Sequence, residues 1–440
     1  MAGDGLRAIV LAAGEGKRLR PLTLTRPKVM LEVGGRPLLA HMLNALKAVG
    51  ISSIVLVVGY MEEAIRSWLG DGERLGLQVS YVRQPEQRGT ADAIALASNE
   101  LGPYEDALVV YGDLLVAPEA LRAVLDEHIR RRPLATIGAV RVERPGQFGM
   151  MLVEDGWLRE LVEKPAEEEW AGPPLANAGI YVLTPEALQA MQDVQPSPRG
   201  ELEATSALQG LAEQGDTVRV AEISPEHWLD VGRPWDLLEA NERVLKSMEP
   251  EVLGKVEPGA HLNGPVFVAE DARIRSGAYI EGPAYIGPGA DVGPNCYIRP
   301  CTSLGRAVRI GNACEIKNSV VMEGTHIGHL SYVGDSIIGA YCNLGAGTIT
   351  ANLRFDKKTI KMTVKGERLD TGRRKLGTVM GDFAQTGIGA LLMPGVRIWP
   401  RCWIGPNVVV ERDVTEEGAF IMLKQELVER RALGGEEGGR

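Results

Sequence analysis

Cysteine is scarce in this chain of 440 residues, and its pattern argues against the usual chemistry of thiols. No two cysteines form a CxxC pair, and all five lie in the C-terminal half: Cys296, Cys301, Cys314, Cys342 and Cys402. The first and third of them occupy positions that a repeat, described below, otherwise gives to small residues. We therefore predict reduced thiols that pack in the interior of a cytosolic protein, in preference to disulfides or metal ligands.

Long apolar runs and an excess of positive charge are also missing. The opening apolar stretch, Ala8 to Ala13, is too short for the core of a secretion signal followed by a cleavage site, and we expect no membrane span. A net charge of -10 argues against a nucleic-acid-binding surface, so anionic ligands must be held by local clusters of Lys and Arg. With 440 residues, 45% of them hydrophobic, the chain is long enough to bury two cores. Since neither a secretion signal nor a membrane span is predicted, we expect a cytoplasmic protein.

The C-terminal half carries a six-residue repeat. Nine large apolar residues follow one another at this spacing: Val268, Ile274, Ile280, Ile286, Val292, Ile298, Leu304, Ile310 and Ile316. Two positions before each stands a smaller residue: Val266, Ala272, Ala278, Ala284, Ala290, Cys296, Thr302, Val308 and Cys314. A period of six fits neither a helix face nor an alternating strand, but it fits a parallel β-helix with three rungs to a turn. The large residues should fill the interior, and the smaller ones should lie near the corners.

The repeat becomes irregular further along the chain. Two five-residue steps indicate bulged rungs in the run Met322, Ile327, Val333, Ile338 and Leu344. The period then breaks from Asn352 to Gly377 and resumes at Leu392, Ile398, Ile404 and Val410. Because the interruption is strongly basic in an acidic protein, we interpret it as a functional loop that meets a phosphate ligand; a solvated loop is the alternative.

The N-terminal part alternates strand-like with helix-like segments. We expect strands at Leu6–Leu11, Ile54–Val58 and Ala107–Tyr111, and helices at Pro37–Val49, Ala91–Glu100 and Trp235–Met248. Such alternation favours a Rossmann-like, doubly wound α/β domain with ligands at the carboxyl ends of the strands. The predicted organisation is therefore an α/β domain over 1–250, a β-helix over 251–428 and a disordered tail over 429–440.

A glycine-containing loop follows the first expected strand. Its sequence, Leu11-Ala12-Ala13-Gly14-Glu15-Gly16-Lys17-Arg18, is followed by Pro27-Lys28. Glycines at this place let backbone N–H groups approach a phosphate. The loop is not a dinucleotide fingerprint, since the third glycine is absent, and it lacks the Gly-Lys-[Ser/Thr] of a P-loop. With Arg18 and Pro27-Lys28 it closely resembles the signature of sugar-1-phosphate nucleotidyltransferases; a tight turn with solvated basic residues is the plainer alternative.

Further segments resemble the motifs of that family, in the family's order. Gln84 and the backbone of Gly89-Thr90 resemble its pyrimidine-reading segment, which together with the loop residues implies a nucleotide site of Leu11, Ala12, Ala13, Gly14, Gln84, Gly89 and Thr90. Asp113 and Asp230 match its two metal carboxylates. The implied sugar-phosphate contacts are Gly149, Glu163, Lys164 and Asn177. Taken singly, each aspartate could cap a helix or turn, and the asparagine could brace a loop.

The chemistry of this family explains the residue types. Attack of a sugar phosphate on the α-phosphorus of a nucleoside triphosphate needs positioning and charge neutralisation, and no covalent intermediate. Mg²⁺ prefers oxygen ligands, so Asp113 and Asp230 are the expected metal site. The resemblance implies that Arg18 holds the departing pyrophosphate with its planar fork of donors and that Lys28 bridges the reacting phosphates.

The repeat resembles that of hexapeptide acyltransferases, which are left-handed β-helices that form trimers. Over nearly the whole chain, the closer resemblance is to bifunctional enzymes that acetylate glucosamine-1-phosphate and then uridylylate it, particularly the archaeal type. The segment His329-Leu330-Ser331-Tyr332 matches the one that carries their acetyl-transfer base. The resemblance implies His329 as the base and Tyr332 as a contact of the amino sugar, because a neutral imidazole can accept a proton from an amine. A lone His at a corner would otherwise be structural.

Other positions match the acetyl-transfer site of that family. The implied contacts of the amino sugar and its phosphate are Arg299, Lys317, Asn343, Asn352, Lys358 and Lys361, and Ala346 matches the acetyl-CoA channel. Arg299 and Lys317 are eighteen residues apart, so they should stack one full turn from each other. The chain departs from the bacterial pattern in a longer insertion after Asn352 and in Thr386-Gly387-Ile388, where a serine is expected near the coenzyme.

The sequence thus predicts a cytoplasmic bifunctional enzyme of UDP-N-acetylglucosamine synthesis. The first domain would use Mg²⁺, UTP or dTTP and a sugar-1-phosphate, and the second would use acetyl-CoA and glucosamine- or galactosamine-1-phosphate. A homotrimer through the β-helix is expected, with no nucleic acid or membrane as partner. One alternative is a nucleotidyltransferase whose β-helix only assembles or regulates it, and another is a non-catalytic subunit. The first does not account for His329, Arg299 and Lys317 in the β-helix, and the second does not account for Lys28 and the two metal carboxylates.

Overall fold

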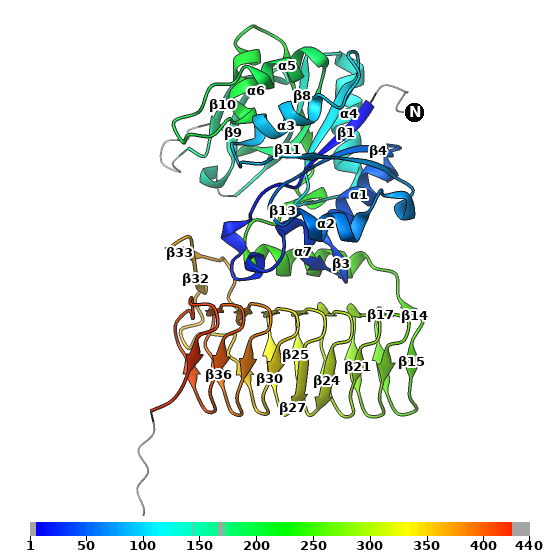
Figure 1. Cartoon of the computed structure of the whole chain (residues 1–440), viewed down its shortest axis with the longest axis vertical. Helices are drawn as coiled ribbons and strands as arrows, with labels where there is room; N and C mark the ends of the chain where they lie inside the picture. The colour runs from blue at the N-terminus through cyan, green and yellow to red at the C-terminus, as the bar shows by residue number, and fades with distance from the viewer. Residues whose placement is uncertain (1–5, 144, 166–169, 171, 425–440) are drawn as a thin grey trace, which may run out of the picture.

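The computed structural model describes residues 6–143, 145–165, 170 and 172–424 and consists of an α/β domain that sits on a long β-helix (Figure 1). The expected tail over 429–440 lies outside the described residues. The α/β domain ends with α7 (Pro234–Ser247), and the β-helix starts with β14 (Glu251–Val252). Whether the two are independent units divided at residue 250 stays a prediction. No helix in the described ranges is long and apolar enough to span a membrane.

A mixed nine-stranded sheet forms the centre of the first domain. Its strands, in spatial order, are β5 (Gln78–Arg83), β4 (Ser53–Val58), β1 (Leu6–Leu11), β6 (Asp106–Tyr111), β11 (Leu175–Leu183), β8 (Ala135–Arg141), β12 (Val218–Ile223), β10 (Trp157–Glu163) and β9 (Gly149–Glu154). The first four are parallel, and β11 runs against both of its main neighbours. Buried residues of the two faces belong to separate hydrophobic clusters.

Helices cover this sheet, and two short ribbons complete the domain. The helices are α1 (Leu38–Ala48), α2 (Glu62–Leu69), α3 (Thr90–Ser98), α4 (Pro118–Arg131), α5 (Pro185–Gln192), α6 (Ala204–Ala212) and α7. The ribbons are β2 (Glu32–Val33) with β3 (Arg36–Pro37), and β7 (Leu114–Val116) with β13 (Trp228–Asp230). The doubly wound fold and the expected strands and helices are confirmed, with ends that move by one or two residues.

The second domain is a left-handed parallel β-helix with three flat sheets. The sheet that faces the first domain, called the domain-facing sheet, contains β14, β17 (Val266–Val268), β20 (Ala284–Ile286), β23 (Thr302–Leu304), β26 (Val320–Val321), β29 (Ile337–Ile338), β34 (Val379–Met380) and β37 (Arg397–Ile398). Its strands pair in parallel, each with the strand one coil further along the chain.

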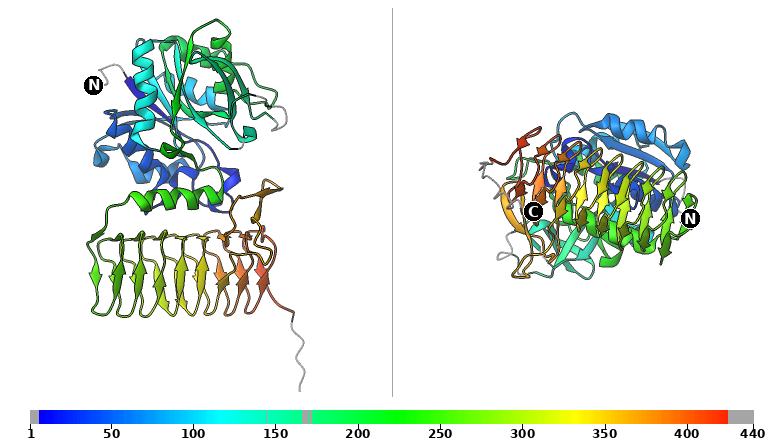
Figure 2. Two further views of the ribbon diagram at one scale, coloured as in Figure 1. Left: turned by 180° about the vertical axis from the view of Figure 1, so that it is seen from behind. Right: turned by 90° about the horizontal axis from the view of Figure 1, so that it is seen from below.

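The other two sheets face away from the first domain (Figure 2). The β15 sheet contains β15 (Lys255–Val256), β18 (Arg273–Ile274), β21 (Asp291–Val292), β24 (Arg309–Asn312), β27 (His326–His329), β30 (Asn343–Leu344), β35 (Gln385–Thr386), β38 (Trp403–Ile404) and β40 (Phe420–Ile421). The β16 sheet contains β16 (His261–Asn263), β19 (Tyr279–Glu281), β22 (Tyr297–Ile298), β25 (Glu315–Lys317), β28 (Tyr332–Gly334), β31 (Ile349–Thr350), β36 (Leu391–Leu392) and β39 (Val409–Val410).

The six-residue period places the large apolar residues inside the coil, as expected. Ile280, Ile298 and Ile316 stack directly in the β16 sheet and are fully buried. The smaller residues two positions before such interior residues are buried as well. They include Cys296, before Ile298, and Cys342, before Leu344. Burial raises the pKa of both thiols to about 12, and all five cysteines are free. The prediction of reduced packing residues is thus consistent with the structure.

The two irregular steps have a different cause from the one predicted. The rungs are shortened by one residue, so that Ile316 pairs with Val333 and Leu304 pairs with Val321, each at an offset of 17 residues. No extra residue bulges out. The shortening also makes Val321 the interior residue, whereas Met322 joins a cluster between the two domains. The spacing alone could not show this, because both positions hold an apolar residue.

The interrupted segment forms a hairpin of β32 (Lys361–Val364) and β33 (Glu367–Asp370), which rises from the β-helix beside the first domain (Figure 1). Its basic side chains are exposed except that of Arg373, which is half-buried, and Ile360, Met362 and Val364 are buried in the interdomain cluster. The sequence interpretation treated the insertion as a ligand-binding loop, with a solvated loop as the alternative. Its alternating apolar residues show that it also contributes to the packing between the domains.

The domain interface contains a fully buried polar residue, Asn241 of α7. Its Oδ1 accepts hydrogen bonds from the Gly34 N–H (3.0 Å) and the Ser303 hydroxyl (2.6 Å). Its Nδ2 donates to the Cys301 carbonyl (3.0 Å). Because a buried amide is costly without partners, these bonds specify how α7 lies on the β-helix.

We expect Asn241→Ala to weaken the docking of the domains by about 3 kcal/mol, since three buried hydrogen bonds of about 1 kcal/mol each are lost. Calorimetry should show a transition at lower temperature or a split into two transitions. The matched control is Asn99→Ala at the end of α3, because the Asn99 amide donates only to carbonyls of its own helix. An unchanged melting profile for Asn241→Ala would contradict this view of the interface.

Candidate functional site

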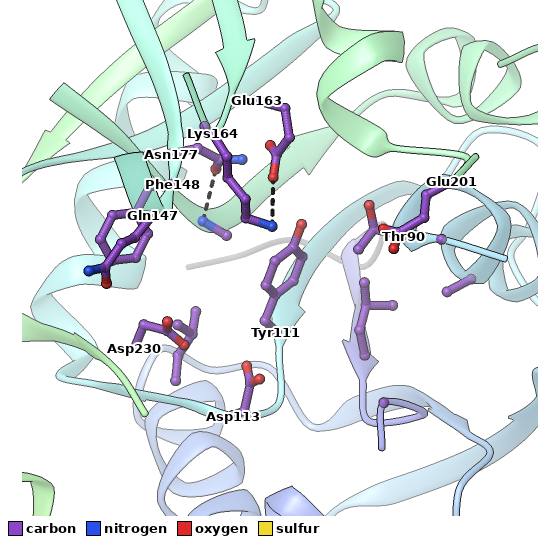
Figure 3. A pocket seen from close by; sticks show the side chains of 18 of the residues that line it. Thr90, Tyr111, Asp113, Gln147, Phe148, Glu163, Lys164, Asn177, Glu201 and Asp230 are labelled. Carbon is purple, nitrogen blue, oxygen red and sulfur yellow. Dashed lines mark hydrogen bonds and ion pairs between the residues drawn. The ribbon is translucent and has the colours of Figure 1, made fainter. Parts of the chain in front are cut away.

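A cavity of ≈ 370 Å³ opens at the carboxyl ends of β1 and β6 in the first domain (Figure 3). It is lined by all but two of the site residues predicted for this domain: Leu11, Ala13, Gly14, Arg18, Gln84, Gly89, Thr90, Asp113, Gly149, Glu163, Lys164, Asn177 and Asp230. The exceptions are Ala12 and Lys28. Ala12 is buried, with its N–H bonded to the Val57 carbonyl at 2.8 Å. Lys28 lies behind the wall and contacts the two aspartates.

The ribbon of β7 and β13 places these aspartates together, although 117 residues separate them in the chain. Asp230 is paired with Leu114, and the Val231 N–H donates to the Asp113 carbonyl at 3.4 Å. The Lys28 ammonium forms a salt bridge with Asp113 and lies 3.7 Å from Asp230. Arg18 approaches Asp230 at 3.9 Å. Two carboxylates and Arg18 thus lie in the cavity wall, with the Lys28 ammonium directly behind them.

The donor set fits a magnesium ion that shares its coordination with a substrate. Asp113 and Asp230 each keep part of their side chain exposed to the cavity, at 24% and 18%. No group of three or more His, Cys, Asp or Glu side chains suited to a metal occurs in the described part of the chain. Mg²⁺ usually takes one or two carboxylates and completes its shell with waters and phosphate oxygens, so the two aspartates suffice. The Lys28 ammonium between them shows that this position attracts positive charge.

Gly89 is required by the close approach of a second segment. The Gly89 backbone has φ +131, and a Cβ atom there would lie 2.2 Å from the Leu202 carbonyl oxygen. The same carbonyl accepts from the Ala91 N–H at 2.8 Å, and the Leu202 N–H donates to the Arg88 carbonyl at 2.7 Å. The Thr90 hydroxyl accepts from the Ala204 N–H at 3.0 Å, where α6 begins. Gly89-Thr90, part of the predicted nucleotide site, is therefore held rigidly by contacts that lie outside the cavity.

Gln84 presents only one of its two polar atoms to a ligand. Its Nε2 donates to the Gly89 carbonyl (3.1 Å) and to Asp92 Oδ2 (2.9 Å), so both amide hydrogens are used. The side chain is nearly buried. Among the described residues, its Oε1 accepts no hydrogen bond. Since rotation of the amide would point Oε1 at a carboxylate and a carbonyl, the orientation is fixed and a hydrogen-bond acceptor faces the cavity.

Tyr111 projects into the cavity between the nucleotide residues and the sugar-phosphate residues (Figure 3). Its hydroxyl lies 3.0 Å from that of Tyr181, which accepts a hydrogen bond from Asn177 Nδ2 at 2.8 Å. The Asn177 Oδ1 accepts from the Gly179 N–H at 2.9 Å. Burial raises the pKa of Tyr181 to about 12 and that of Tyr111 well above its ordinary value, so both phenols stay neutral.

Several lining residues escaped the sequence analysis. They include Tyr111, Gln147, Phe148 and Glu201. Tyr111 stands directly before Gly112-Asp113, a position that could have been noticed. Glu201 lies on the segment that crosses Gly89, and no local motif reveals this contact. The predicted Glu163 and Lys164 form an ion pair at 3.1 Å at the end of β10, where Gly149 pairs with Glu163.

A second polar cluster surrounds Asp335 at the end of β28. The Asp335 carboxylate is almost fully buried and accepts from Lys317 Nζ at 3.0 and 2.8 Å, from Asn318 Nδ2 at 2.9 Å and from Asn352 Nδ2 at 2.5 Å. Asn352 also donates to the Tyr332 hydroxyl at 3.1 Å. Three predicted residues of the acetyl-transfer site thus meet around an aspartate that the sequence analysis did not select.

Arg299 lies one coil away from Lys317, as the spacing predicted. Its backbone N–H donates to the Ile316 carbonyl at 2.8 Å, and its guanidinium pairs with Glu315 at 2.8 Å. The Arg299 Nε is buried and has no acceptor in the described residues. Each of the two cations therefore has a carboxylate partner in the chain, and the buried Nε of Arg299 is left without an acceptor in the described residues.

The remaining predicted residues of this site are exposed and lie further apart. His329 is at the corner between the β15 and β16 sheets, and the Gly347 N–H of the next coil donates to its carbonyl at 3.3 Å, which brings Ala346 close. Asn343 lies in the β15 sheet, whereas Lys358 and Lys361 belong to the insertion. Within the described ranges, no hydrogen bond or ion pair links the side chains of these four polar residues. One chain does not bring them together.

Thr386 has an interior position instead of facing a coenzyme. It aligns with Leu344 and Ile404, and its hydroxyl lies 2.7 Å from that of Thr348 inside the coil. Ile388, two residues further along, is exposed. The expected serine equivalent is therefore not supplied by Thr386.

Comparison with known proteins finds similarity in both domains. Residues 7–247 match the nucleotidyl transferase family, and residues 280–381 match the GMPPB C-terminal domain family. The bifunctional protein GlmU of Methanococcus maripaludis (strain C7) is 43% identical over 422 residues, which are 96% of this chain and 98% of that protein. A bifunctional sugar-1-phosphate nucleotidylyltransferase/acetyltransferase of Sulfurisphaera tokodaii is 39% identical over 93% of this chain and 98% of that protein.

A solved structure supports the fold of the first domain. It comes from Bacillus anthracis, is assigned to the glucose-1-phosphate thymidylyltransferases and contains sucrose; it covers 56% of this chain and 97% of its own, with 27% identity and a TM-score of 0.51. From the match over residues 7–247 and the similarity over nearly the whole length, the chain belongs to the nucleotidyl transferase family and, within it, to the bifunctional GlmU proteins.

Proposed function

We propose that this chain is a bifunctional enzyme of nucleotide-sugar synthesis. The first domain transfers UMP or dTMP to a sugar-1-phosphate with release of pyrophosphate, and the β-helix N-acetylates an amino-sugar-1-phosphate with acetyl-CoA. The observation that carries the proposal is the cavity in which Asp113, Asp230 and Arg18 line the wall in front of Lys28. The family membership and the polar cluster at Asp335 support the second activity.

In the first reaction, an oxygen of the sugar phosphate attacks the α-phosphorus of the nucleotide. A new P–O bond forms, the bond from the α-phosphorus to the oxygen bridging the β-phosphate breaks, and pyrophosphate leaves. Arg18 offers donors to the leaving group, and the Lys28 ammonium neutralises charge on the reacting phosphates once it exchanges its carboxylate partners for phosphate oxygens. Asp113 and Asp230 would hold Mg²⁺, which supplies further charge neutralisation when bound.

We expect Asp113→Asn to lower pyrophosphate release by roughly a hundredfold or more, because a neutral amide is a poor magnesium ligand. The assay uses UTP, N-acetylglucosamine-1-phosphate and Mg²⁺. Asp126→Asn, on the exposed side of α4, is the control and should keep the original rate. A rate for Asp113→Asn equal to that of the unmodified enzyme would exclude this site as the metal site.

The fixed orientation of Gln84 supports a preference for uracil and thymine. Both bases carry an N3–H that can donate to the exposed Oε1 of Gln84. Cytosine has an unprotonated N3, which would meet the same oxygen as a second acceptor. Uracil and thymine cannot be told apart by this contact, so UTP and dTTP are both proposed as substrates.

The unmodified enzyme should use UTP and dTTP with kcat/KM values at least about a hundredfold above that of CTP, because an unpaired buried acceptor is costly. Asp92→Asn should reduce this discrimination, since the amide of Gln84 is then free to turn its Nε2 towards the base. Pyrophosphate release with the three nucleotides measures both effects. Equal use of CTP by the unmodified enzyme would refute the proposed contact.

In the second reaction, the amine of the sugar attacks the thioester carbonyl of acetyl-CoA. A C–N bond forms, the C–S bond breaks, the amine proton passes to the His329 imidazole, and CoA leaves as a thiol after protonation. Lys317 and Arg299 bind the phosphate of the amino sugar, and Tyr332 and Asn352 orient its ring. The exposed imidazole, without a hydrogen bond from the described residues, is accessible to an incoming amine.

The dispersed positions of His329, Asn343 and the insertion lysines support a site shared between copies of the chain. The domain-facing sheet is covered, which leaves the β15 and β16 sheets as the faces of the β-helix through which copies would associate. His329 lies at the corner between these two sheets. We therefore keep the homotrimer as part of the proposal.

Free CoA should appear when the enzyme meets acetyl-CoA and glucosamine- or galactosamine-1-phosphate, and His329→Ala should lower this rate by about 10²–10⁴-fold. Pyrophosphate release by the same variant should be unchanged, because His329 lies far from the cavity of the first domain. His326→Ala, an exposed histidine at the other end of the same strand, is the matched control. If the unmodified enzyme releases no CoA with either sugar, the β-helix has no acetyl-transfer activity.

A further inference from the structure

Asn318 links the Asp335 cluster to the first domain. It follows Lys317 at a coil corner, with φ 45. Its Nδ2 donates to Asp335 Oδ1 at 2.9 Å and to Glu242 Oε1 at 3.1 Å. Both amide hydrogens are therefore used, and the orientation is fixed because the opposite one would direct Oδ1 at two carboxylates. Asn318 Oδ1 itself is buried and has no partner among the described residues.

Glu242 belongs to α7 and holds a second part of the β-helix domain. Its Oε1 also forms an ion pair with Arg373, at the end of the insertion. The Arg373 carbonyl accepts from the Ile360 N–H at 2.9 Å, next to Lys361. One carboxylate of the first domain thus contacts both the coil that carries Lys317 and the base of the loop that carries the predicted substrate lysines.

We infer that Glu242 is a positioning residue of the acetyl-transfer site, which acts through Asn318 on Asp335. The inference rests on the acetyl transfer proposed above. Glu242 contacts neither substrate, so the first domain would complete the second active site without entering it. Its contribution is to hold the donors that surround Asp335 in one arrangement.

The charges explain why this positioning is needed. Asp335 is a buried carboxylate, and its oxygens are satisfied by Lys317, Asn318 and Asn352. Without Glu242, the Asn318 amide loses the partner that fixes its rotation and can turn away from Asp335. The Lys317 ammonium and the Asn352 amide would then settle into altered positions around the carboxylate. Both are proposed contacts of the amino-sugar phosphate, so binding of that substrate should weaken first.

The test compares Glu242→Ala and Glu242→Gln in the full-length enzyme. We expect Glu242→Ala to raise KM for the amino-sugar-1-phosphate by about tenfold, with little change in kcat or in KM for acetyl-CoA, because displaced contacts weaken positioning. Glu242→Gln keeps an acceptor for Asn318 and should restore part of the loss. Glu239→Gln is the matched control, since Glu239 lies on the same helix and, within the described part of the chain, pairs with Arg243 alone, at 2.7 Å. Pyrophosphate release should be unchanged in all three.

The outcomes separate this inference from the function on which it rests. Acetyl-transfer constants for Glu242→Ala equal to those of the unmodified enzyme would overturn it. So would an equal loss of both activities together with a lower melting temperature, which indicates a merely structural role. If the unmodified enzyme itself releases no CoA with any amino-sugar-1-phosphate, the proposed acetyl transfer fails, and the positioning role fails with it.

Discussion

The burial of the domain-facing sheet is the constraint on which the arrangement of the molecule depends. A regular β-helix exposes three flat faces, but here the outward residues Val320, Ile337 and Val379 are buried in one cluster with Leu22 and Trp235 of the first domain. Removal of these apolar side chains from water favours docking, and it is non-directional. The buried amide of Asn241 adds the direction, because its hydrogen bonds form in only one register of α7 on the coils.

The same helix connects the chemistry of the two domains. α7 begins four residues after Asp230, a predicted magnesium ligand, and carries Glu242 next to the Asp335 cluster. A shift of α7 along the β-helix would therefore disturb both the ribbon of β7 and β13 and the hydrogen bonds of Asn318. The packing between the domains thus gives the ribbon of β7 and β13 and the Asp335 cluster a common support.

The elements that follow a strict periodicity were predictable from the sequence. The six-residue spacing specified the β-helix because each rung repeats the same environment, and motif residues such as Asp113 and Asp230 could be assigned although only β-ribbon pairing brings them together. Contacts between distant segments were not predictable. Asp335, Glu201 and Met322 gain their roles from neighbours far along the chain, and a local pattern of apolar and polar residues contains no information about those neighbours.

The residues of the proposed acetyl-transfer site are dispersed in one chain, and their positions are related to the covered domain-facing sheet. The donors of the Asp335 cluster belong to coils directly below α7, whereas the proposed base His329 lies on the far corner of the triangle, exposed and without a side-chain partner in the described residues. A ligand that contacts the Asp335 cluster and also reaches an acetyl donor beside His329 must therefore lie along the β16 sheet, which runs between the cluster and His329. In the proposed homotrimer, another copy of the chain would enclose the ligand on that open face, and the docking of the first domain leaves this face of the β-helix available for the subunit interface.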